Sequence, residues 1–318
     1  MLVINSNEII KLLDYKSLIK EIKSTFRKAD FCPPREIYNI DKNSILEKSQ
    51  LLLMPAFIKN KYYGVKLLNI FPNNPSKGLD RVKALYVLFD KNNGNIKAII
   101  DGTILTKYRT AAMSALASSY LSYKNSNNLL IIGTGSLVPY MISAHTIVRP
   151  IKNVYIWGRN YERAKKVVTN IKNVNINLTA VKEFTKISQN MDIISTVTSS
   201  SQPLLYSKNF KKGVHLDLVG AHNKDMIELD SEAFKWGEIY VEDIDSAFSE
   251  AGDLIKSLSL GYIKRKNIKN NISELIKENR YMRSNKEQTT IFKSVGHSFS
   301  DLAAAILIYK KYISDIKI

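Results

Sequence analysis

The sequence predicts an α/β fold in which a Rossmann-type domain is combined with a mixed α+β domain. Residues 128–159 read as strand, glycine turn, helix and strand. Strands and helices continue to alternate after them, which is typical of a parallel sheet covered by helices. The segments before residue 101 are short strands separated by turns, as in an antiparallel sheet. We therefore expect two domains that are built differently.

The glycine turn indicates that the Rossmann-type domain binds a dinucleotide. Residues 129–132 are an apolar run typical of a strand buried on both faces, and glycines follow at positions 133 and 135. Glycine lets backbone N–H groups approach a pyrophosphate, and the N-terminal end of the next helix, 137–148, favours the same negative charge. Val138 replaces the third glycine of the G-x-G-x-x-G pattern, so an ordinary strand-turn-helix corner is the alternative. The expected pyrophosphate-binding residues are Gly133, Thr134, Gly135, Ser136 and Leu137.

The end of the second strand, Val154 to Trp157, indicates which dinucleotide binds. NAD-specific sites usually carry Asp or Glu here, because a carboxylate accepts hydrogen bonds from the ribose 2′-hydroxyl. This chain has Gly158, Arg159 and Asn160 instead. An arginine pairs with a 2′-phosphate and stacks on adenine, so Arg159 and Asn160 favour NADP(H), with NAD(H) as the alternative. The other interpretation of Arg159 is a solvated loop residue.

The composition is that of a soluble globular protein. The 318 residues, 45% of them hydrophobic and 24% charged, are enough for two domains with sizeable cores. The single cysteine, Cys32, excludes an internal disulfide framework. The first residues do not read as a signal peptide, and no apolar run is long enough to cross a membrane, so we expect a cytoplasmic protein.

The formal net charge of +18 raises the question of an anionic partner. The lysines are scattered among asparagine and isoleucine residues, so we expect no specific nucleic-acid partner and no membrane partner. The charge instead helps to attract anionic substrates and a phosphorylated cofactor. No group of His, Cys and carboxylate residues has the spacing of metal ligands, so no metal is expected.

The first domain is predicted to begin with helices and to continue as a sheet. Apolar residues recur at helical spacing between Ser6 and Lys28, and Pro33 and Pro34 stop this segment. Arg35 and Glu36 open a strand, and further strands are expected at 49–55, 62–71, 82–89 and 96–100, with a hairpin turn at 91–95. A helix of small residues is predicted from Thr110 to a break at 125–127.

After Arg159 the chain is predicted to alternate between helices and strands. The expected helices are 161–171, 181–188, 274–277 and 300–312, and the expected strands are 178–180, 192–196, 213–219, 238–241 and 290–295. Hydroxyl residues follow the strand 192–196 at the edge of the sheet where a cofactor lies. The last helix is expected to return to the first domain.

Five blocks match one family in the same order along the chain. They are MPAFIKNKYYGVKLLNIFPNN, DGTILTKYRTAAMSALA, GTGSLVPYMISAHTIVRP with VYIWGRN, HLDLVGAHNKDMIELD, and IFKSVGHSFSDLAAA. With these blocks, spread over nearly its whole length, the chain resembles the ornithine cyclodeaminase/μ-crystallin family. The resemblance implies a homodimer. It also implies a Rossmann-type NAD(P)-binding domain of residues 119–296 plus an α+β substrate-binding/dimerisation domain of residues 1–118, completed by residues 297–318.

The resemblance also implies a substrate site. In the family, an early Arg, the Lys of the YGxK block and the Arg of the LTxxRT block hold the substrate carboxylate, which gives this role to Arg35, Lys66 and Arg109. Cations suit a carboxylate in a pocket that excludes water, because Arg binds it through two hydrogen bonds and Lys adds a point charge. The alternative for each residue is an ordinary surface cation.

Two departures from the family disfavour a substrate with a second amine. Ornithine cyclodeaminases carry acidic residues where this chain has Leu52 and His222. A second buried ammonium group would therefore remain unpaired, which costs several kcal/mol. A cyclic imine needs an apolar wall, which Leu52 supplies, and a proton at nitrogen, which His222 supplies near neutral pH. The alternative for His222 is a hydrogen-bonded loop residue. His297 is a secondary candidate, whereas His145 and His215 are expected to be packing residues.

These observations predict an NADPH-preferring reductase of Δ1-pyrroline-2-carboxylate or Δ1-piperideine-2-carboxylate, which yields L-proline or L-pipecolate. Lys66 and His222 are the candidate catalytic residues, and the residues expected beside the nicotinamide are Thr196, Val219 and Ser294. The alternatives are an ornithine or lysine cyclodeaminase, an amino-acid dehydrogenase, and a non-catalytic NADPH-dependent ligand-binding protein. The last of these would not need three carboxylate ligands.

Overall fold

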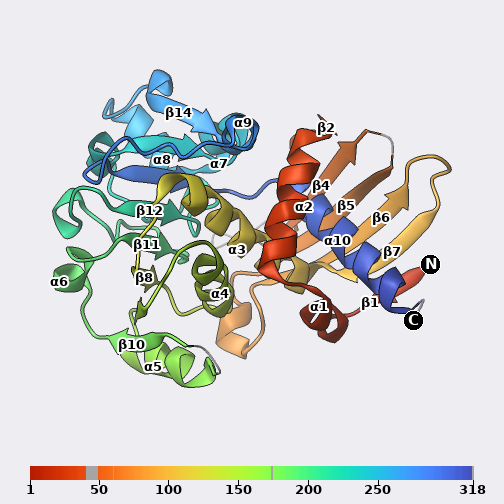
Figure 1. Ribbon diagram of the computed structural model, residues 1–318, viewed down its shortest axis with the longest axis horizontal. Helices are drawn as coiled ribbons and strands as arrows, with labels where there is room; N and C mark the ends of the chain where they lie inside the picture. Colours follow the sequence, from red (N-terminus) through yellow and green to blue (C-terminus); the bar gives the residue numbers. More distant parts are fainter. Residues whose placement is uncertain (41–48, 60, 173–174, 317–318) are drawn as a thin grey trace. The chain divides into compact units, whose positions relative to one another are not determined.

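The computed structural model describes residues 1–40, 49–59, 61–172 and 175–316. The chain forms two compact units (Figure 1). Unit 1 consists of Met1–Met113 with His297–Ile318, and unit 2 consists of Ser114–Gly296. The division falls within helix α3 (Gly102–Leu121).

Unit 1 is built on a sheet with the strand order β1-β7-β6-β5-β4-β2, in which β3 also pairs with β4. Strand β1 runs parallel to β7, and the other neighbouring strands are antiparallel. The strands are β1 (Leu2–Ile4), β2 (Ala29–Phe31), β3 (Glu36–Asn39), β4 (Gln50–Ile58), β5 (Tyr62–Ile70), β6 (Val82–Asp90) and β7 (Ile96–Asp101). The antiparallel meander predicted from the sequence is therefore present.

Helices cover one face of this sheet. Every second residue of β4 and β5 is buried, because side chains alternate between the two faces of a strand. Helix α10 (Ser298–Ile316) packs on β4, β5 and β6, and α2 (Tyr15–Arg27) lies beside it (Figure 1). The apolar run 302–308 explains the burial of α10. The short α1 (Ser6–Leu12) precedes α2. The last helix of the chain thus completes the unit that the first residues begin.

Unit 2 is a parallel sheet with the strand order β10-β9-β8-β11-β12-β15-β13-β14. The chain passes from β8 outward to β9 and β10, and then returns to β11 on the other side of β8. The carboxyl ends of β8 and β11 therefore flank a topological switch point, where ligands bind in open α/β sheets. The strands are β8 (Asn128–Ile132), β9 (Asn153–Trp157), β10 (Asn177–Val181), β11 (Ile193–Thr196), β12 (His215–Leu218), β13 (Glu238–Val241), β14 (Ile268–Asn271) and β15 (Thr290–Lys293).

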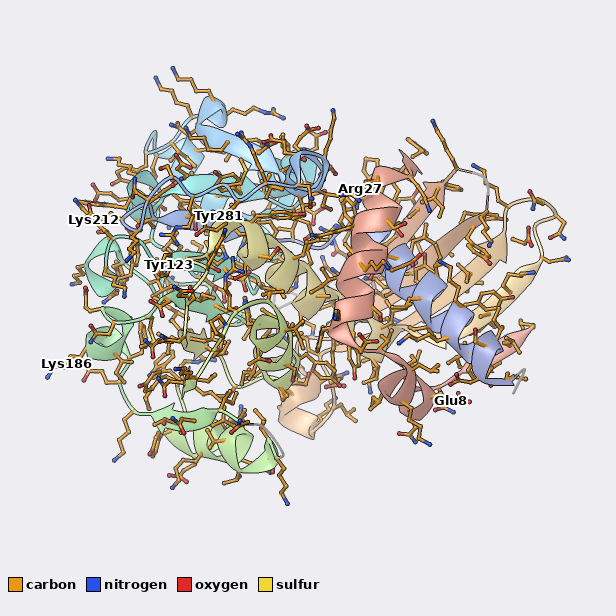
Figure 2. All side chains as sticks on the ribbon, in the orientation of Figure 1. Glu8, Arg27, Tyr123, Lys186, Lys212 and Tyr281 are labelled. Carbon is orange, nitrogen blue, oxygen red and sulfur yellow. The ribbon has the colours of Figure 1, made fainter. Side chains whose placement is uncertain are left out.

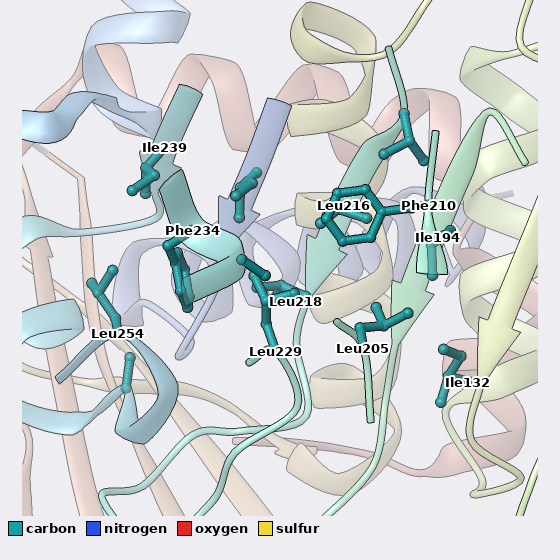
Figure 3. Close-up of a cluster of buried hydrophobic side chains, with 14 of the residues drawn as sticks. Ile132, Ile194, Leu205, Phe210, Leu216, Leu218, Leu229, Phe234, Ile239 and Leu254 are labelled. Carbon is teal, nitrogen blue, oxygen red and sulfur yellow. The ribbon is translucent and has the colours of Figure 1, made fainter. Parts of the chain in front are cut away.

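The core of unit 2 fixes this sheet. Figure 3 shows a continuous cluster of buried side chains that includes Ile132, Ile194, Leu218 and Phe234. The first three come from the adjacent strands β8, β11 and β12, so the cluster holds these strands in register. The helices are α4 (Val138–Val148), α5 (Tyr161–Asn170), α6 (Thr185–Ser188), α7 (Ile244–Glu250), α8 (Gly252–Ser259) and α9 (Ile272–Glu278).

Two predicted elements are corrected by the structure. Val181 belongs to β10, where it pairs with Trp157, so the helix predicted at 181–188 is reduced to α6. Helix α3 begins at Gly102 and not at Thr110. The carboxylate of Asp101 accepts a hydrogen bond from the backbone N–H of Ile104 at 2.9 Å and so caps the first turn. Strands β1, β2 and β14 and helices α7 and α8 are additions to the prediction, because such short segments give little sequence signal.

The excess positive charge is distributed over the surface. Figure 2 shows Lys186 and Lys212 extending outward from unit 2, and both are exposed. Among the described helices, none is long and apolar enough to cross a membrane.

Candidate active site

Strand β5 carries the central residue of the unit 1 site, Lys66. In the antiparallel register Lys66 lies opposite Met54 of β4 and Tyr86 of β6, and all three residues are buried. The side chain of Lys66 is completely inaccessible to solvent. A buried ammonium group needs a charged partner, because otherwise nothing offsets the free-energy cost of removing it from water.

Asp301, in the first turn of α10, is that partner. Its carboxylate oxygens lie 2.8 and 2.7 Å from Nζ of Lys66 and accept hydrogen bonds from it. One of them, Oδ1, also lies 2.8 Å from Nε of Arg109, which comes from α3. The Nε–H of Arg109 is not aligned for a hydrogen bond, so this second contact is an ion pair only. The buried carboxylate of Asp301 thus forms ion pairs with both Lys66 and Arg109, two of the three cations predicted to bind the substrate.

The surroundings lower the pKa of Lys66 to about 7. The largest cause is burial, followed by the charge of Arg109; Asp301 raises the pKa, and Arg35 lowers it further. Arg35 is therefore close enough to act on the charge of Lys66, so the structure brings the three predicted cations into one region. Lys66 and Arg109 share the single carboxylate of Asp301, and such a pair of cations favours a ligand with an anionic group.

The same face of the sheet supplies an apolar wall and a free hydroxyl. Leu52 is buried in a cluster with Met54, Leu68 and Ile70. The hydroxyl of Tyr86 is also buried, and among the described residues it has no hydrogen-bond partner. Burial and the nearby negative charge of Asp301 raise the pKa of Tyr86. A neutral donor and an apolar surface therefore accompany the cations.

In unit 2 the glycine turn has the features that a pyrophosphate needs. Gly133 has a φ of 141°, which favours glycine, and a Cβ there would lie 2.8 Å from Val197. A Cβ at Gly135 would meet no atom within 4 Å, so packing does not require this glycine. Gly135 and Ser136 are exposed at the start of α4. Open backbone at the N-terminal end of a helix binds anions, so residues 133–137 fit a dinucleotide.

Three predicted residues lie along the carboxyl edge of the parallel sheet. Thr196 ends β11, Val219 follows β12 and Ser294 follows β15, and these strands are adjacent. The hydroxyl of Thr196 is buried and has no hydrogen-bond partner in the described part of the chain. Ser294 donates a hydrogen bond to Glu242, which also accepts one from the backbone N–H of Gly296 at 2.9 Å. The unpaired hydroxyl of Thr196 is a group that a bound ligand can satisfy.

The loop after β12 places His222. Its Nδ1 lies 2.8 Å from the carbonyl oxygen of Gly220, and a carbonyl oxygen only accepts, so Nδ1 carries the proton. The carboxylate of Glu228 holds the same loop by accepting a hydrogen bond from the backbone N–H of Ala221 at 2.9 Å. Glu228 also accepts bonds from N and Oγ1 of Thr198, after β11, at 2.7 and 2.8 Å. Burial raises the pKa of Glu228.

Arg159 and Asn160, which follow β9, have different environments. Arg159 is exposed. The side chain of Asn160 caps α5, because its Oδ1 accepts a hydrogen bond from the backbone N–H of Arg163 at 3.0 Å. Asn160 therefore has a structural duty in addition to any contact with a cofactor.

The other histidines have separate environments. His145 and His215 are completely buried; Nε2 of His145 lies 3.3 Å from Asp217, and Nδ1 of His215 lies 3.0 Å from Oγ1 of Thr290. The ring of His297 stacks on Phe299 with a centroid distance of 5.0 Å. Within the described ranges no group of three or more His, Cys, Asp or Glu residues is arranged to hold a metal ion.

Two residues of the candidate site, Asp301 and Glu228, were not predicted from the sequence. Asp301 lies within the quoted block SFSDLAAA, and an acidic residue inside an apolar helical run is a signal for a buried charge pair. Glu228 follows the loop of His222 by six positions, but nothing local indicates that it returns to the ends of two strands. Its role depends on tertiary structure.

The parallel sheet and its glycine turn define a protein of the Rossmann class, and the reductases among its relatives, named below, make it an oxidoreductase. The chain belongs to the ornithine cyclodeaminase/mu-crystallin family, whose model matches residues 2–315. The family resemblance seen in the sequence blocks is thereby confirmed.

Named relatives and solved structures agree with this assignment. The chain is 32% identical to Δ1-pyrroline-2-carboxylate reductase of Colwellia psychrerythraea, over 98% of this chain and 99% of that protein. The structure of Δ1-pyrroline-2-carboxylate reductase of Thermococcus litoralis in complex with NADH and L-proline is similar, with a TM-score of 0.93 and 28% identity over 99% of this chain and 98% of that one. The structure of an archaeal alanine dehydrogenase dimer with bound NAD is also similar, with a TM-score of 0.90 and 29% identity over 99% of this chain and 97% of that one.

Proposed function

We propose that the protein is a nicotinamide-dependent reductase of cyclic α-imino acids. The substrates would be Δ1-pyrroline-2-carboxylate or Δ1-piperideine-2-carboxylate, and the products L-proline or L-pipecolate. The observation that carries the proposal is the cluster of Lys66, Arg109 and Asp301 beside the apolar surface of Leu52. The similarity to reductases of this type supports it.

Each residue of the cluster has a part in binding the substrate. Arg109 and Arg35 pair with the substrate carboxylate, and Lys66 adds charge when it is protonated. Asp301 keeps Lys66 and Arg109 in place, so the cations do not need to reorganise when the carboxylate arrives. Leu52 contacts the ring methylenes.

Reduction of the imine adds a hydride to carbon and a proton to nitrogen. The nicotinamide cofactor supplies the hydride when it is bound. His222 supplies the proton: its Nδ1–H is directed at Gly220, so Nε2 carries the transferable proton when the ring is protonated. Glu228 holds the His222 loop in position.

Unit 2 holds the cofactor through the glycine turn and the carboxyl edge of its sheet. Residues 133–137 bind the pyrophosphate, and Thr196, Val219 and Ser294 lie on the nicotinamide side. The segment after β9 carries Arg159 and no carboxylate that could accept hydrogen bonds from the ribose hydroxyls, which favours NADP(H) over NAD(H). The solved relatives named above hold NADH or NAD.

A homodimer is part of the proposal, with the uncovered face of the unit 1 sheet as the interface. The rings of Phe31, Phe57, Tyr63 and Phe89 stack across β2, β4, β5 and β6, with centroid distances of 6.2, 5.6 and 4.8 Å. Phe31 is 60% exposed, and Leu85 is 39% exposed. A largely apolar sheet face of this kind favours a second copy of the chain, which buries it by symmetry.

An amino-acid dehydrogenase is the second candidate, since the alanine dehydrogenase has a similar fold and identity. Consumption of the reduced cofactor separates the candidates. The reductase predicts rapid consumption with Δ1-pyrroline-2-carboxylate, little with a 2-oxo acid plus ammonia, and none without an acceptor. Faster turnover with the 2-oxo acid and ammonia would indicate the dehydrogenase. Release of proline from ornithine would indicate a cyclodeaminase, and absence of all turnover would indicate a binding protein.

A further inference from the structure

Unit 2 contains a pocket of about 280 Å³ beside the glycine turn. One side of the pocket is formed by the turn and the start of α4, through Thr134, Gly135, Ser136 and Pro139. The other side is formed by α5, through Arg163, Lys166, Val167 and Asn170. The pocket therefore joins exposed backbone and hydroxyl groups with two cations.

These two cations are available to a ligand. Arg163 and Lys166 are exposed, and among the described residues neither side chain makes an ion pair or a hydrogen bond. Lys165, which lies between them in sequence, is different: it pairs with Glu162 at 3.0 Å and does not line the pocket. Lys165, whose charge is balanced by Glu162, thus lies outside the pocket. Arg163 and Lys166, which have no anionic partner among the described residues, line the pocket.

The pocket borders the glycine turn, and this turn lies against the end of β9. Gly133 donates a backbone hydrogen bond to Trp157 at 2.8 Å, which holds the turn against the end of β9. A Cβ at Gly158 would lie 2.5 Å from the methyl group of Thr134, so the turn and the residue after β9 are in close contact. The end of this strand is where Rossmann proteins distinguish a ribose hydroxyl from a ribose phosphate.

We propose that Arg163 and Lys166 form a phosphate-binding site that recognises the 2′-phosphate of NADP(H). The proposal rests on the nicotinamide cofactor of the proposed function and assigns its specificity to side chains of α5. Arg159, the candidate from the sequence, does not line this pocket, and Asn160 is engaged in capping α5. A phosphate monoester carries a charge of roughly −1.5 to −2 near neutral pH, which two cations match.

Equilibrium binding of NADPH and NADH, measured by calorimetry without turnover, tests the proposal. Arg163→Gln and Lys166→Gln should each raise the Kd of NADPH by roughly ten- to a hundredfold, because each removes a charge-assisted hydrogen bond. The Kd of NADH should change less than about twofold. Lys165→Gln is the matched control, since it removes the same charge from the same helix and should leave both constants unchanged.

Two nucleotide fragments distinguish the 2′-phosphate from the pyrophosphate as the occupant of the pocket. Adenosine 2′,5′-bisphosphate should bind the wild-type protein more tightly than adenosine 5′-diphosphate, and both variants should abolish this difference. An equal loss of affinity for both fragments would overturn the proposal in favour of a pyrophosphate contact. Unchanged affinities in variants with unaltered melting temperatures would overturn it as well.

Failure of the proposed function would be a separate result. If no imine is reduced with either cofactor, the ratio of the NADPH and NADH constants still reports on Arg163 and Lys166 alone. If the imine is reduced and the variants do not change that ratio, only the phosphate site is refuted.

Discussion

Both carboxylate oxygens of Asp301 accept hydrogen bonds from the ammonium group of Lys66, at 2.8 and 2.7 Å from Nζ. Both side chains are completely buried, and they come from the last helix and a central strand of unit 1. The pairing is long-range in sequence, so the C-terminal helix is needed to complete the cation cluster. A substrate carboxylate that binds near Lys66 and Arg109 enters a site whose positive charge is already partly neutralised.

Replacement of Asp301 tests this arrangement. In Asp301→Asn, Lys66 and Arg109 lose their shared anion, so Lys66 should become neutral at a lower pH and Arg109 should lose its fixed position. We expect the KM for the imino acid to rise at least about tenfold, and the protein to be destabilised by about 3 to 5 kcal/mol if Lys66 remains charged. Steady-state kinetics and denaturant unfolding measure the two effects. Asp315→Asn, an exposed change near the end of α10, is the control and should alter neither.

The pKa of Lys66 predicts a pH dependence of binding. Burial and the charge of Arg109 lower this pKa to about 7 from its ordinary value of 10.5. Lys66 therefore loses its proton as the pH rises through about 7, and the affinity for L-proline, which carries the same carboxylate, should fall over that range. Binding should also be accompanied by proton uptake above pH 7, because the carboxylate stabilises the ammonium form. Calorimetry in buffers of different ionisation enthalpy detects the uptake, and a Kd that is constant with pH would contradict the assignment.

His215 predicts a loss of stability in acid. Burial chiefly lowers its pKa to about 3 from 6.5; Asp217 opposes this shift, and His145 adds to it. The ring is thus neutral in the folded state, whereas in the unfolded state it becomes protonated below pH 6.5. The stabilising contribution is complete above 6.5 and is lost toward pH 3, at about 1.4 kcal/mol per pH unit. Denaturant unfolding of wild type and of His215→Gln checks this. Equal slopes of stability against pH in the two proteins would show that His215 is not responsible.

The elements that could be predicted from the sequence are those with a local pattern of apolar residues. The apolar strand before Gly133 and the alternation in β4 and β5 are visible because burial imposes a period on each kind of element. The start of α3 was missed because its first turn depends on a cap from Asp101 and on close packing at Gly102, where a Cβ would lie 2.8 Å from the backbone of Ala84.

Features that depend on long-range contacts could not be predicted in the same way. Lys66 and Arg109 were selected by resemblance, but their common partner Asp301 lies far away in the sequence. The pairing with Asp301 becomes evident only when α10 is placed on β5. The pocket beside the glycine turn likewise depends on which face of α5 approaches α4, and a single exposed cation such as Arg163 gives no sequence signal of its own.

The uncovered sheet face predicts the oligomeric state. Val87 lies in the middle of β6, opposite Val65 of β5 and Ile99 of β7, on the face away from α10. Val87→Glu should place a charge inside the proposed interface and convert a dimer into a monomer, as measured by light scattering during size-exclusion chromatography. Leu260→Glu, which changes a 57% exposed residue of unit 2, should leave the dimer intact. A monomeric wild-type protein would refute the proposed interface.

Truncation of Arg109 tests the carboxylate-binding role directly. A charge-assisted hydrogen bond contributes about 1.5 to 3 kcal/mol, so Arg109→Ala should lower kcat/KM by roughly ten- to a hundredfold. The Kd of NADPH should barely change. Lys107→Ala is a matched control on the same helix, because Lys107 is paired with Asp80 at 3.0 Å and outside the cluster.

A neutral substrate analogue separates loss of charge from loss of structure. When the substrate carboxylate is replaced by an amide, Arg109→Ala should differ less from wild type, because the amide does not require the missing cation. If instead Arg109→Ala abolishes NADPH binding or dimerisation, while each folded and loaded site turns over normally, Arg109 is a structural residue. The carboxylate would then have to be bound by other residues.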